Sequence, residues 1–284
     1  MFRNSFSGAA FLVVSSLIFI VGCNSKIKEK PLQVKHSSIK ISEKEWKDSD
    51  KKTENSPKKD SKKYLYLTFD DGPNKGTPQV VKSLKKEKIP ATLFLVGEHI
   101  YGSKAQLSDF ELIANDTLFQ IANHSYSHAN NQFSKYYKDS AKVLEDFNRV
   151  NDSLNRKLMI SRTPGRNIWR LDSIKVTDLK SSKDCADFLA ENGFVLVGWD
   201  IEWKCNNESK LKETGDEMMS LIDSAYSKKR MQTENHLVLL THDQYFRDSL
   251  SIAELDKFLQ KLNKREDIVI RKIKDYPGIG TEVQ

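Results

Sequence analysis

The sequence predicts an α/β fold built around a parallel β-sheet, either open or closed into a barrel. From Tyr64 onward, short apolar runs rich in aromatic and β-branched residues alternate with longer stretches that carry apolar residues at helical spacing. About seven such pairs follow one another, an alternation typical of parallel sheets. The 284 residues are 38% hydrophobic and 30% charged, which favours one or two globular domains over a protein with many membrane spans.

The elements follow from these runs in chain order. The first strand is predicted at residues 64–69, before Gly72-Pro73, a pair that cannot continue a strand. Similar runs predict further strands at residues 91–96, 119–123, 158–161, 194–199, 236–240 and 268–270. Helical spacing predicts helices at residues 77–86, 108–115, 136–154, 183–191, 214–228 and 252–262. Residues 167–182 show no readable pattern, so no element is predicted there.

The N-terminus has the features of a targeting signal. Arg3 precedes a short apolar stretch at residues 9–21, which suits a signal peptide better than a membrane span. The stretch ends in Val21-Gly22-Cys23 and resembles a bacterial lipobox, in which the cysteine becomes the lipidated first residue. We therefore expect residues 1–22 to be a lipoprotein signal peptide and Cys23 to anchor the protein in the cell envelope, facing the periplasm or the outside. The alternative is an ordinary signal peptide or an uncleaved anchor with an incidental cysteine.

Residues 23–63 read as a disordered, Lys-rich tether ahead of a folded domain at residues 64–284. Between residues 24 and 63 there are thirteen Lys and seven acidic residues, a net charge of +6, and Arg3 adds one more. The whole chain carries +7, from 46 basic and 39 acidic residues, so the domain itself is near neutral. A nucleic-acid partner is not expected, because its binding face would need positive charge on the domain. Pairing of Cys185 with Cys205 is left open.

Residues whose side chains can take part in catalysis or bind a metal follow the predicted strands. In parallel folds of this kind the active site forms at the carboxyl ends of the strands, so residues at these positions are expected to share one rim. They are Asp70 and Asp71 after the first strand, His124 and His128 after the third, Arg162 after the fourth, Asp200, Glu202 and Trp203 after the fifth, and His242 after the sixth.

Two imidazoles and a carboxylate at this rim can form a catalytic metal site with open positions for water and substrate. His124 and His128 are four residues apart and point the same way in one helical turn or a similar loop. Asp70 and Asp71 leave the strand on different sides, so one can bind the metal while the other acts as a base. His242 is a candidate general acid. The plainer alternatives are a simple turn at Asp70-Asp71, surface histidines, and a capping or core role for His242.

Five ordered motifs carry a family resemblance. They are Thr68-Phe69-Asp70-Asp71-Gly72-Pro73, His124-Ser125-x-x-His128, Arg162-x-Pro164, Asp200-x-Glu202-Trp203 and Leu239-x-x-His242. In this order they resemble the polysaccharide deacetylase family, also known as the NodB-homology group or carbohydrate esterase family four. The resemblance spans about residues 64–271, nearly the whole predicted domain. It implies a distorted (β/α) barrel with seven strands, and hydrolysis of N-acetyl, or sometimes O-acetyl, groups on a sugar polymer.

The resemblance also implies residue roles. Asp70 becomes the catalytic base, paired with and oriented by Arg162, and His242 becomes the general acid. Asp71, His124 and His128 become ligands of a divalent metal, most often zinc, with cobalt as the alternative. Glu202 is expected to be linked to Arg162 or to His242. Trp203 and Leu239 are expected to form an apolar pocket for the acetyl methyl group.

Two positions depart from the family pattern. Gly165 stands where an aromatic residue usually follows the proline of the third motif, although its backbone N–H can still help to form an oxyanion hole. We expect Trp169 to replace the missing ring as a platform for the sugar. Glu202 stands where aspartate is usual and keeps the charge with one more methylene.

The expected function is metal-dependent N-deacetylation of an envelope or extracellular glycan such as peptidoglycan or a chitin-like polymer, by a monomer. Three alternatives stay open: an O-acetyl esterase acting on a glycan, an inactive carbohydrate-binding lipoprotein, and an amidohydrolase acting on a small non-sugar amide. The presence of all the expected ligands, the base and the acid argues against an inactive protein. The polymer itself cannot be read from the sequence.

Overall fold

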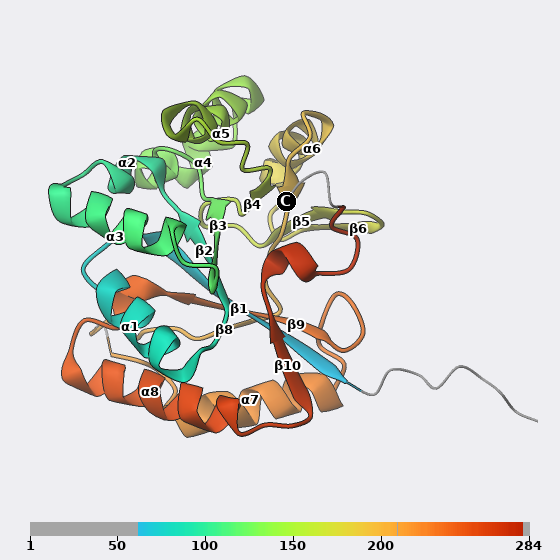
Figure 1. The fold of residues 1–284 in the computed structure, drawn as a ribbon. Helices are drawn as coiled ribbons and strands as arrows, with labels where there is room; N and C mark the ends of the chain where they lie inside the picture. Colours follow the sequence, from blue (N-terminus) through green and yellow to red (C-terminus); the bar gives the residue numbers. More distant parts are fainter. Residues whose placement is uncertain (1–61, 209, 281–284) are drawn as a thin grey trace, which may run out of the picture. The chain divides into compact units, whose positions relative to one another are not determined.

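The computed structural model describes residues 62–208 and 210–280 (Figure 1). The predicted signal peptide, Cys23 and nearly all of the predicted tether lie outside these residues. The strands are β1 (Lys63–Gly72), β2 (Ala91–Leu95), β3 (Phe119–Asn123), β4 (Ile160–Ser161), β5 (Ile168–Leu171), β6 (Ile174–Thr177), β7 (Val195–Leu196), β8 (Ile201–Glu202), β9 (His236–His242) and β10 (Ile268–Arg271). The α-helices are α1 (Thr77–Glu87), α2 (Gly97–Ile100), α3 (Lys104–Ala114), α4 (Phe133–Tyr136), α5 (Ser140–Leu154), α6 (Lys183–Glu191), α7 (Gly215–Ser227) and α8 (Ser249–Asn263). Short 3₁₀ turns are η1 (His128–Asn131), η2 (Lys180–Ser182), η3 (Asp243–Tyr245) and η4 (Ile273–Asp275).

The strands form one curled sheet with β1 near its centre. Its order is β6-β5-β7-β4-β3-β2-β1-β9-β8. β9 pairs with β1 on one side, while β10 and β2 share the other side, along the first and second halves of β1. Every pairing is parallel except those of β5 with β6 and with β7. The predicted α/β fold with a curled, barrel-like sheet is confirmed. The antiparallel hairpin of β5 and β6 lies where no element was predicted.

Side chains alternate between the two faces of β1, and this alternation positions the site. Leu65, Leu67 and Phe69 face a core shared with helices α1, α3, α7 and α8. Tyr66 faces the inside of the curled sheet and packs in a second core with Trp169 and Tyr276. Thr68 and Asp70 follow Tyr66 at the two-residue spacing of a strand and therefore share its inward face.

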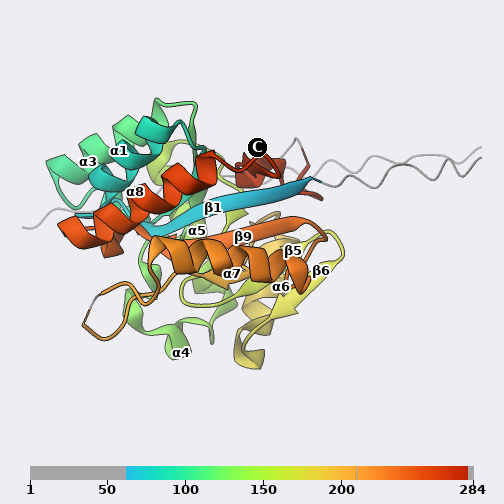
Figure 2. The same ribbon diagram turned by 90° about the horizontal axis from the view of Figure 1, so that it is seen from below.

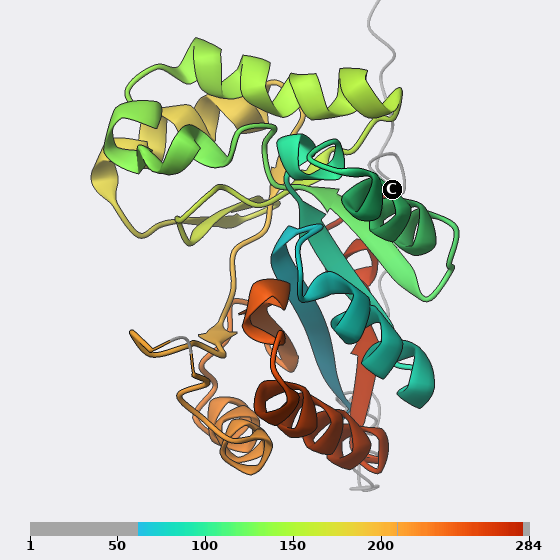
Figure 3. The same cartoon turned by 90° about the vertical axis from the view of Figure 1, so that its left-hand side faces the viewer.

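The helices form two groups, which the views in Figures 1, 2 and 3 separate. One group contains α3, α1, α8 and α7, with each helix packed against the next. The other contains α5 and α6, which pack together and bury a third core that includes Phe147 and Leu189.

Several helix boundaries differ from the prediction because local caps set them. The predicted helix at residues 136–154 is broken between α4 and α5, where the Asp139 side chain accepts a hydrogen bond from Lys142 N. Helix α3 begins earlier than predicted, where Ser103 caps Gln106 N. Cys185 and Cys205 are both free thiols. No helix of residues 62–208 or 210–280 has the length and apolar character needed to span a membrane.

Candidate active site

A buried ion pair lies on the inward face of β1. Asp70 is 2% exposed, and its Oδ1 accepts a hydrogen bond of 2.8 Å from Nη1 of the fully buried Arg162. The guanidinium also donates to Thr68 Oγ1 and to the carbonyls of Val197 and Gly198, and these bonds fix its plane. The predicted contact between Asp70 and Arg162 is therefore present. Asp70 Oδ2 makes no bond to the arginine and lies 3.7 Å from His124 Nε2.

Three side chains converge beside this pair in the arrangement of a metal site. Asp71, His124 and His128 each offer one ligand atom, and these atoms lie within 4.8 Å of one another. Asp71 Oδ1 is 3.3 Å from His124 Nε2 and 3.1 Å from His128 Nε2, yet it has no hydrogen-bond partner in the described part of the chain. Three donor atoms that point at one spot without bonding to each other fit a single divalent cation.

The backbone and a neighbouring carbonyl orient these ligands. His124 Nδ1 lies 2.9 Å from the Arg162 carbonyl oxygen, and donation to this acceptor leaves Nε2 with its lone pair toward Asp71. Asp71 has a φ of 73°, which turns its side chain away from the path of β1. Burial on its own would raise the pKa of Asp71, but in the absence of a cation protonated imidazoles of His124, His128 and His242 would outweigh burial and hold that pKa well below its usual range.

His242 closes the site from the next strand. It pairs in register with Asp70 across β9 and β1, and its Nε2 lies 3.8 Å from Asp71 Oδ2. Its Nδ1 is buried and has no hydrogen-bond partner within the described residues. The ring packs against Tyr245, with centroids 5.0 Å apart. His242 is therefore next to the candidate metal site on the side away from Arg162.

Glu202 and Trp169 lie differently from the expectation. Glu202 pairs with Lys204 Nζ at 3.1 Å and makes no direct contact with Arg162 or His242 among the described residues, but its negative charge counteracts the lowering of the Arg162 pKa by burial, so its predicted link to Arg162 is electrostatic. Trp169 is fully buried and packs against Tyr276 inside the curled sheet, so its face cannot serve as a sugar platform.

The predicted methyl pocket is not open at Trp203 and Leu239. Both side chains are fully buried. The Trp203 ring packs against Phe246 and Phe258, and its Nε1 donates to the Glu213 carbonyl oxygen. Trp203 is therefore part of the hydrophobic core next to the site and does not line an open pocket.

Gly165 is exposed at the edge of the site with a φ of +62°, a left-handed conformation that favours glycine. Its N–H has no hydrogen-bond partner in the described segments of the chain. The predicted oxyanion-hole donor is therefore available.

The sequence analysis missed three residues that support Asp71 and its loop. His99 Nδ1 lies 2.7 Å from the Asp71 carbonyl oxygen, and Gln244 Nε2 donates to Asp71 Oδ2 at 3.2 Å. Asp243 is fully buried and accepts hydrogen bonds from Asn74, in the loop after β1, and from Thr77, at the start of α1. Its burial raises its pKa to about 7. Asp243 and Gln244 directly follow His242 in the chain, and this position next to a candidate catalytic residue could have identified them from the sequence.

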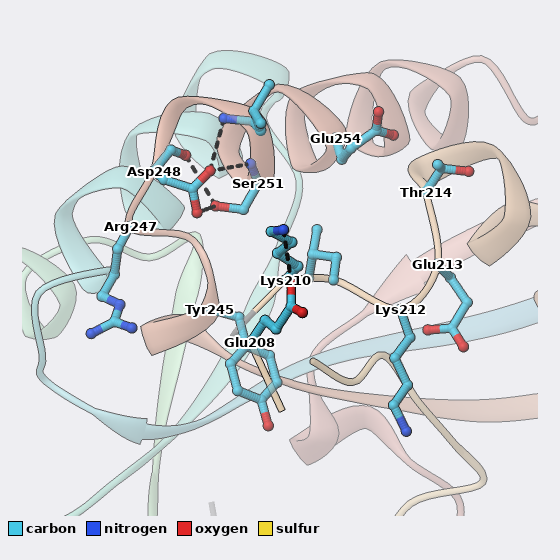
Figure 4. A pocket seen from close by; sticks show the side chains of 12 residues that line it. Glu208, Lys210, Lys212, Glu213, Thr214, Tyr245, Arg247, Asp248, Ser251 and Glu254 are labelled. Carbon is cyan, nitrogen blue, oxygen red and sulfur yellow. Dashed lines mark hydrogen bonds and ion pairs between the residues drawn. The ribbon is translucent and has the colours of Figure 1, made fainter. Parts of the chain in front are cut away.

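Two hollows adjoin these residues. One, of about 360 Å³, is lined by Asp71, His128, His99 and Gln244 among others, and gives access to the candidate metal site. The other, of about 590 Å³, lies beyond Tyr245 between the segment before α7 and the start of α8 (Figure 4). Tyr245 lines this second hollow and also touches His242, so the hollow lies beside the site.

Part of the chain matches a known protein family. Residues 57–167 match the family described as "Polysaccharide deacetylase", and this range contains Asp70, Asp71, His124, His128 and Arg162. The match therefore includes the first three of the five motifs. It is 24% identical to the chitin disaccharide deacetylase of Vibrio alginolyticus, over 76% of this chain and 72% of that one. It is 25% identical to the peptidoglycan-N-acetylglucosamine deacetylase of Bacillus cereus, over 72% of this chain and 67% of that one.

Solved structures share the fold of this chain. A Streptococcus mutans CE4 esterase superposes with a TM-score of 0.54 at 21% identity, covering 74% of this chain and 86% of that one. Bacillus subtilis PdaA, a family 4 carbohydrate esterase, superposes with a TM-score of 0.51 at 23% identity, covering 75% and 80%. The family match and the two relatives support the predicted enzyme class, a polysaccharide deacetylase.

Proposed function

We propose that this protein is a metal-dependent hydrolase that removes N-acetyl groups from N-acetylated sugars of an envelope or extracellular glycan. The observation that carries the proposal is the convergence of Asp71, His124 and His128 beside the Asp70–Arg162 pair, with His242 opposite. A bound divalent cation, for which zinc suits two imidazoles and a carboxylate and cobalt is the alternative, supplies Lewis-acid activation of water and of the amide carbonyl.

The side chains divide the work around the acetamido group. Arg162 holds Asp70 Oδ1, so Asp70 Oδ2 is free to take the proton of the attacking water on the side of His124. The Gly165 N–H makes no hydrogen bond to residues 62–208 or 210–280 and can donate to the oxygen that becomes negative in the transition state. His242 gives a proton to the departing amine, which is a poor leaving group without one. The reaction consumes one water and yields acetate and a free amino sugar.

The substrate is proposed as a polymer for two reasons. A relative named for peptidoglycan N-acetylglucosamine acts on a polymer, and the hollow beyond Tyr245 leaves room for units that flank the reacting sugar. A relative named for chitin disaccharide supports an N-acetylated sugar as the reacting unit. We also propose that Cys23 is lipidated and anchors the protein in the envelope, within reach of such glycans. Transfer of labelled palmitate to the wild-type protein, with none to Cys23→Ala, is the expected result of a labelling experiment.

Acetate release tests the activity. The full chain, purified in detergent, is incubated with N-acetylglucosamine oligomers, purified peptidoglycan and O-acetylated xylan, before and after a chelator and with zinc or cobalt restored. Metal-restored release from an N-acetylated glycan is expected. Acetate release from xylan alone would show that the protein hydrolyses O-acetyl esters instead of N-acetyl groups. If the protein binds one metal per chain and releases no acetate from any of the glycans, the proposed substrate class is refuted.

A further inference from the structure

Phe133 fills the space left by the small residue of the third motif. A Cβ built on Gly165 would lie 3.1–3.2 Å from three atoms of the Phe133 ring, closer than side chains normally approach. The same ring meets the His128 ring edge to face, with centroids 5.5 Å apart and planes at 90°. Phe133 therefore lies between a candidate metal ligand and the candidate oxyanion-hole donor.

The chain holds this ring in place from two sides. Tyr137, one turn further along, is buried and donates through its hydroxyl to the Pro164 carbonyl at 2.7 Å, which fastens the end of α4 to the loop that carries Gly165. The Arg166 guanidinium lies 6.0 Å from the Phe133 ring centre, within the range of a cation–π contact. Phe133 itself is only half-buried, so part of the ring remains open at the site.

We infer that Phe133 is a substrate-contact residue, and that its ring forms an aromatic wall beside Gly165 against which the apolar face of the reacting sugar packs. This inference rests on the proposed function. The aromatic group that the family resemblance places after the proline is supplied here by α4, and Gly165 is small because Phe133 occupies its side-chain space. A flat apolar ring matches the C–H face of a pyranose, which is the chemical class this wall accepts.

A purely structural role makes a different prediction. If Phe133 served only to hold His128, its loss would weaken metal binding first, and substrate binding would change only through the metal. If it forms the aromatic wall, metal binding stays intact while sugar binding weakens. Metal affinity and sugar affinity therefore separate the two roles.

The experiment measures both affinities and turnover for Phe133→Ala. The probe is tetra-N-acetylglucosamine, titrated calorimetrically into the full chain loaded with zinc. We expect about a tenfold weaker affinity and a matching rise in KM, with zinc stoichiometry and affinity unchanged. Phe133→Tyr, which keeps the ring, should restore binding. Phe188→Ala on α6 removes another half-buried phenylalanine, one without a described contact to His128 or Gly165, and should leave all of these values unchanged.

A swap of the ring adds a second, independent test. Gly165→Phe alone should impair sugar binding, because the new side chain meets Phe133 and is strained at a φ of +62°. Combined with Phe133→Ala, the same substitution has room, so the double variant should bind the probe better than Gly165→Phe does. If the losses of binding free energy of the two single variants add in the double variant, Phe133 and a side chain at position 165 do not occupy the same space.

The outcomes distinguish this inference from the proposed function. If the wild type binds the probe without releasing acetate, the deacetylase proposal fails, while weaker binding by Phe133→Ala still supports the wall. If Phe133→Ala loses zinc affinity with unchanged sugar affinity, or changes nothing, the wall is overturned while the activity stands. A wild type that neither binds nor hydrolyses the probe overturns both.

Discussion

The buried pair of Asp70 and Arg162 allows stability and catalysis to be separated by a double-mutant cycle. The two side chains are 3% and 0% exposed and 2.8 Å apart. At an effective dielectric constant of 20 their attraction is about 6 kcal/mol, and much of it is offset by the loss of hydration. Removing one partner leaves a buried charge without its counterpart, which costs about 3–5 kcal/mol of unfolding free energy.

Asp70→Asn and Arg162→Met are each expected to lower the unfolding free energy by about 3 kcal/mol or more. The double variant should lose far less than the sum, because it buries no unpaired charge. It will not regain full stability, since Thr68 Oγ1 and two carbonyls lose their donor. We expect a coupling energy of about 3 kcal/mol.

The assay is urea unfolding followed by tryptophan fluorescence, with metal removed by a chelator so that metal affinity does not enter the free energies. Acetate release is measured on the same four proteins with metal restored. All three variants should lose turnover by about 10²- to 10⁴-fold, including the double variant that recovers stability. Asp70→Asn and the double variant lack the base, and Arg162→Met leaves Asp70 without the partner that orients it. Losses of stability that add within about 0.5 kcal/mol would refute the pairing argument. Near-normal turnover in Asp70→Asn would remove Asp70 as the base.

Three further variants test other parts of the structure. His124→Ala should lose bound metal and acetate release together, measured by elemental analysis after dialysis, and retention of one metal per chain would exclude His124 as a ligand. Trp169→Ala should cost about 3–5 kcal/mol in urea unfolding because it empties a buried site, whereas a sugar platform would give a raised KM at unchanged stability. Burial raises the pKa of Asp200 to about 7, above its ordinary 3.8, so the folded state binds the carboxyl proton more tightly than the unfolded state does. The contribution of Asp200 to the free energy of unfolding therefore falls as the pH rises from 3.8 to 7, by up to about 4 kcal/mol. Between pH 5 and pH 8, the unfolding free energy of Asp200→Asn should therefore fall less than that of the wild type. Equal falls in the two proteins would contradict a raised pKa of Asp200.

The placement of the candidate site residues could be predicted from the sequence where it depends on strand ends alone. Asp70, His124 and His242 follow three strands whose carboxyl ends lie at one edge in any parallel sheet, so their convergence required no knowledge of side-chain packing. The hairpin of β5 and β6 was missed because its strands are four residues long and carry Arg170 and Lys175 among apolar residues. Runs this short give no reliable periodicity.

Errors arose where the direction of a side chain decides its role. Trp169 follows the third motif closely and was expected at the surface, but residue alternation along β5 turns it inward, onto Tyr276. Glu202 keeps the charge that the family resemblance requires and acts on Arg162 through that charge, but its carboxylate forms an ion pair with Lys204, two residues along the chain. Position along the chain could not reveal either direction, because both depend on partners brought in by the fold.

The division of work between Asp70 and Asp71 shows where residue patterns stop and tertiary contacts begin. Two adjacent carboxylates at the end of a strand must point differently, and the sequence therefore predicted two roles without assigning them on physical grounds. Two features of the fold assign them. Asp70 continues the inward face of β1 and meets Arg162, which directly follows β4. Asp71 turns away at positive φ and meets the imidazoles of His124 and His128. The buried arginine therefore selects the base, because the carboxylate that it holds cannot also turn toward both histidines.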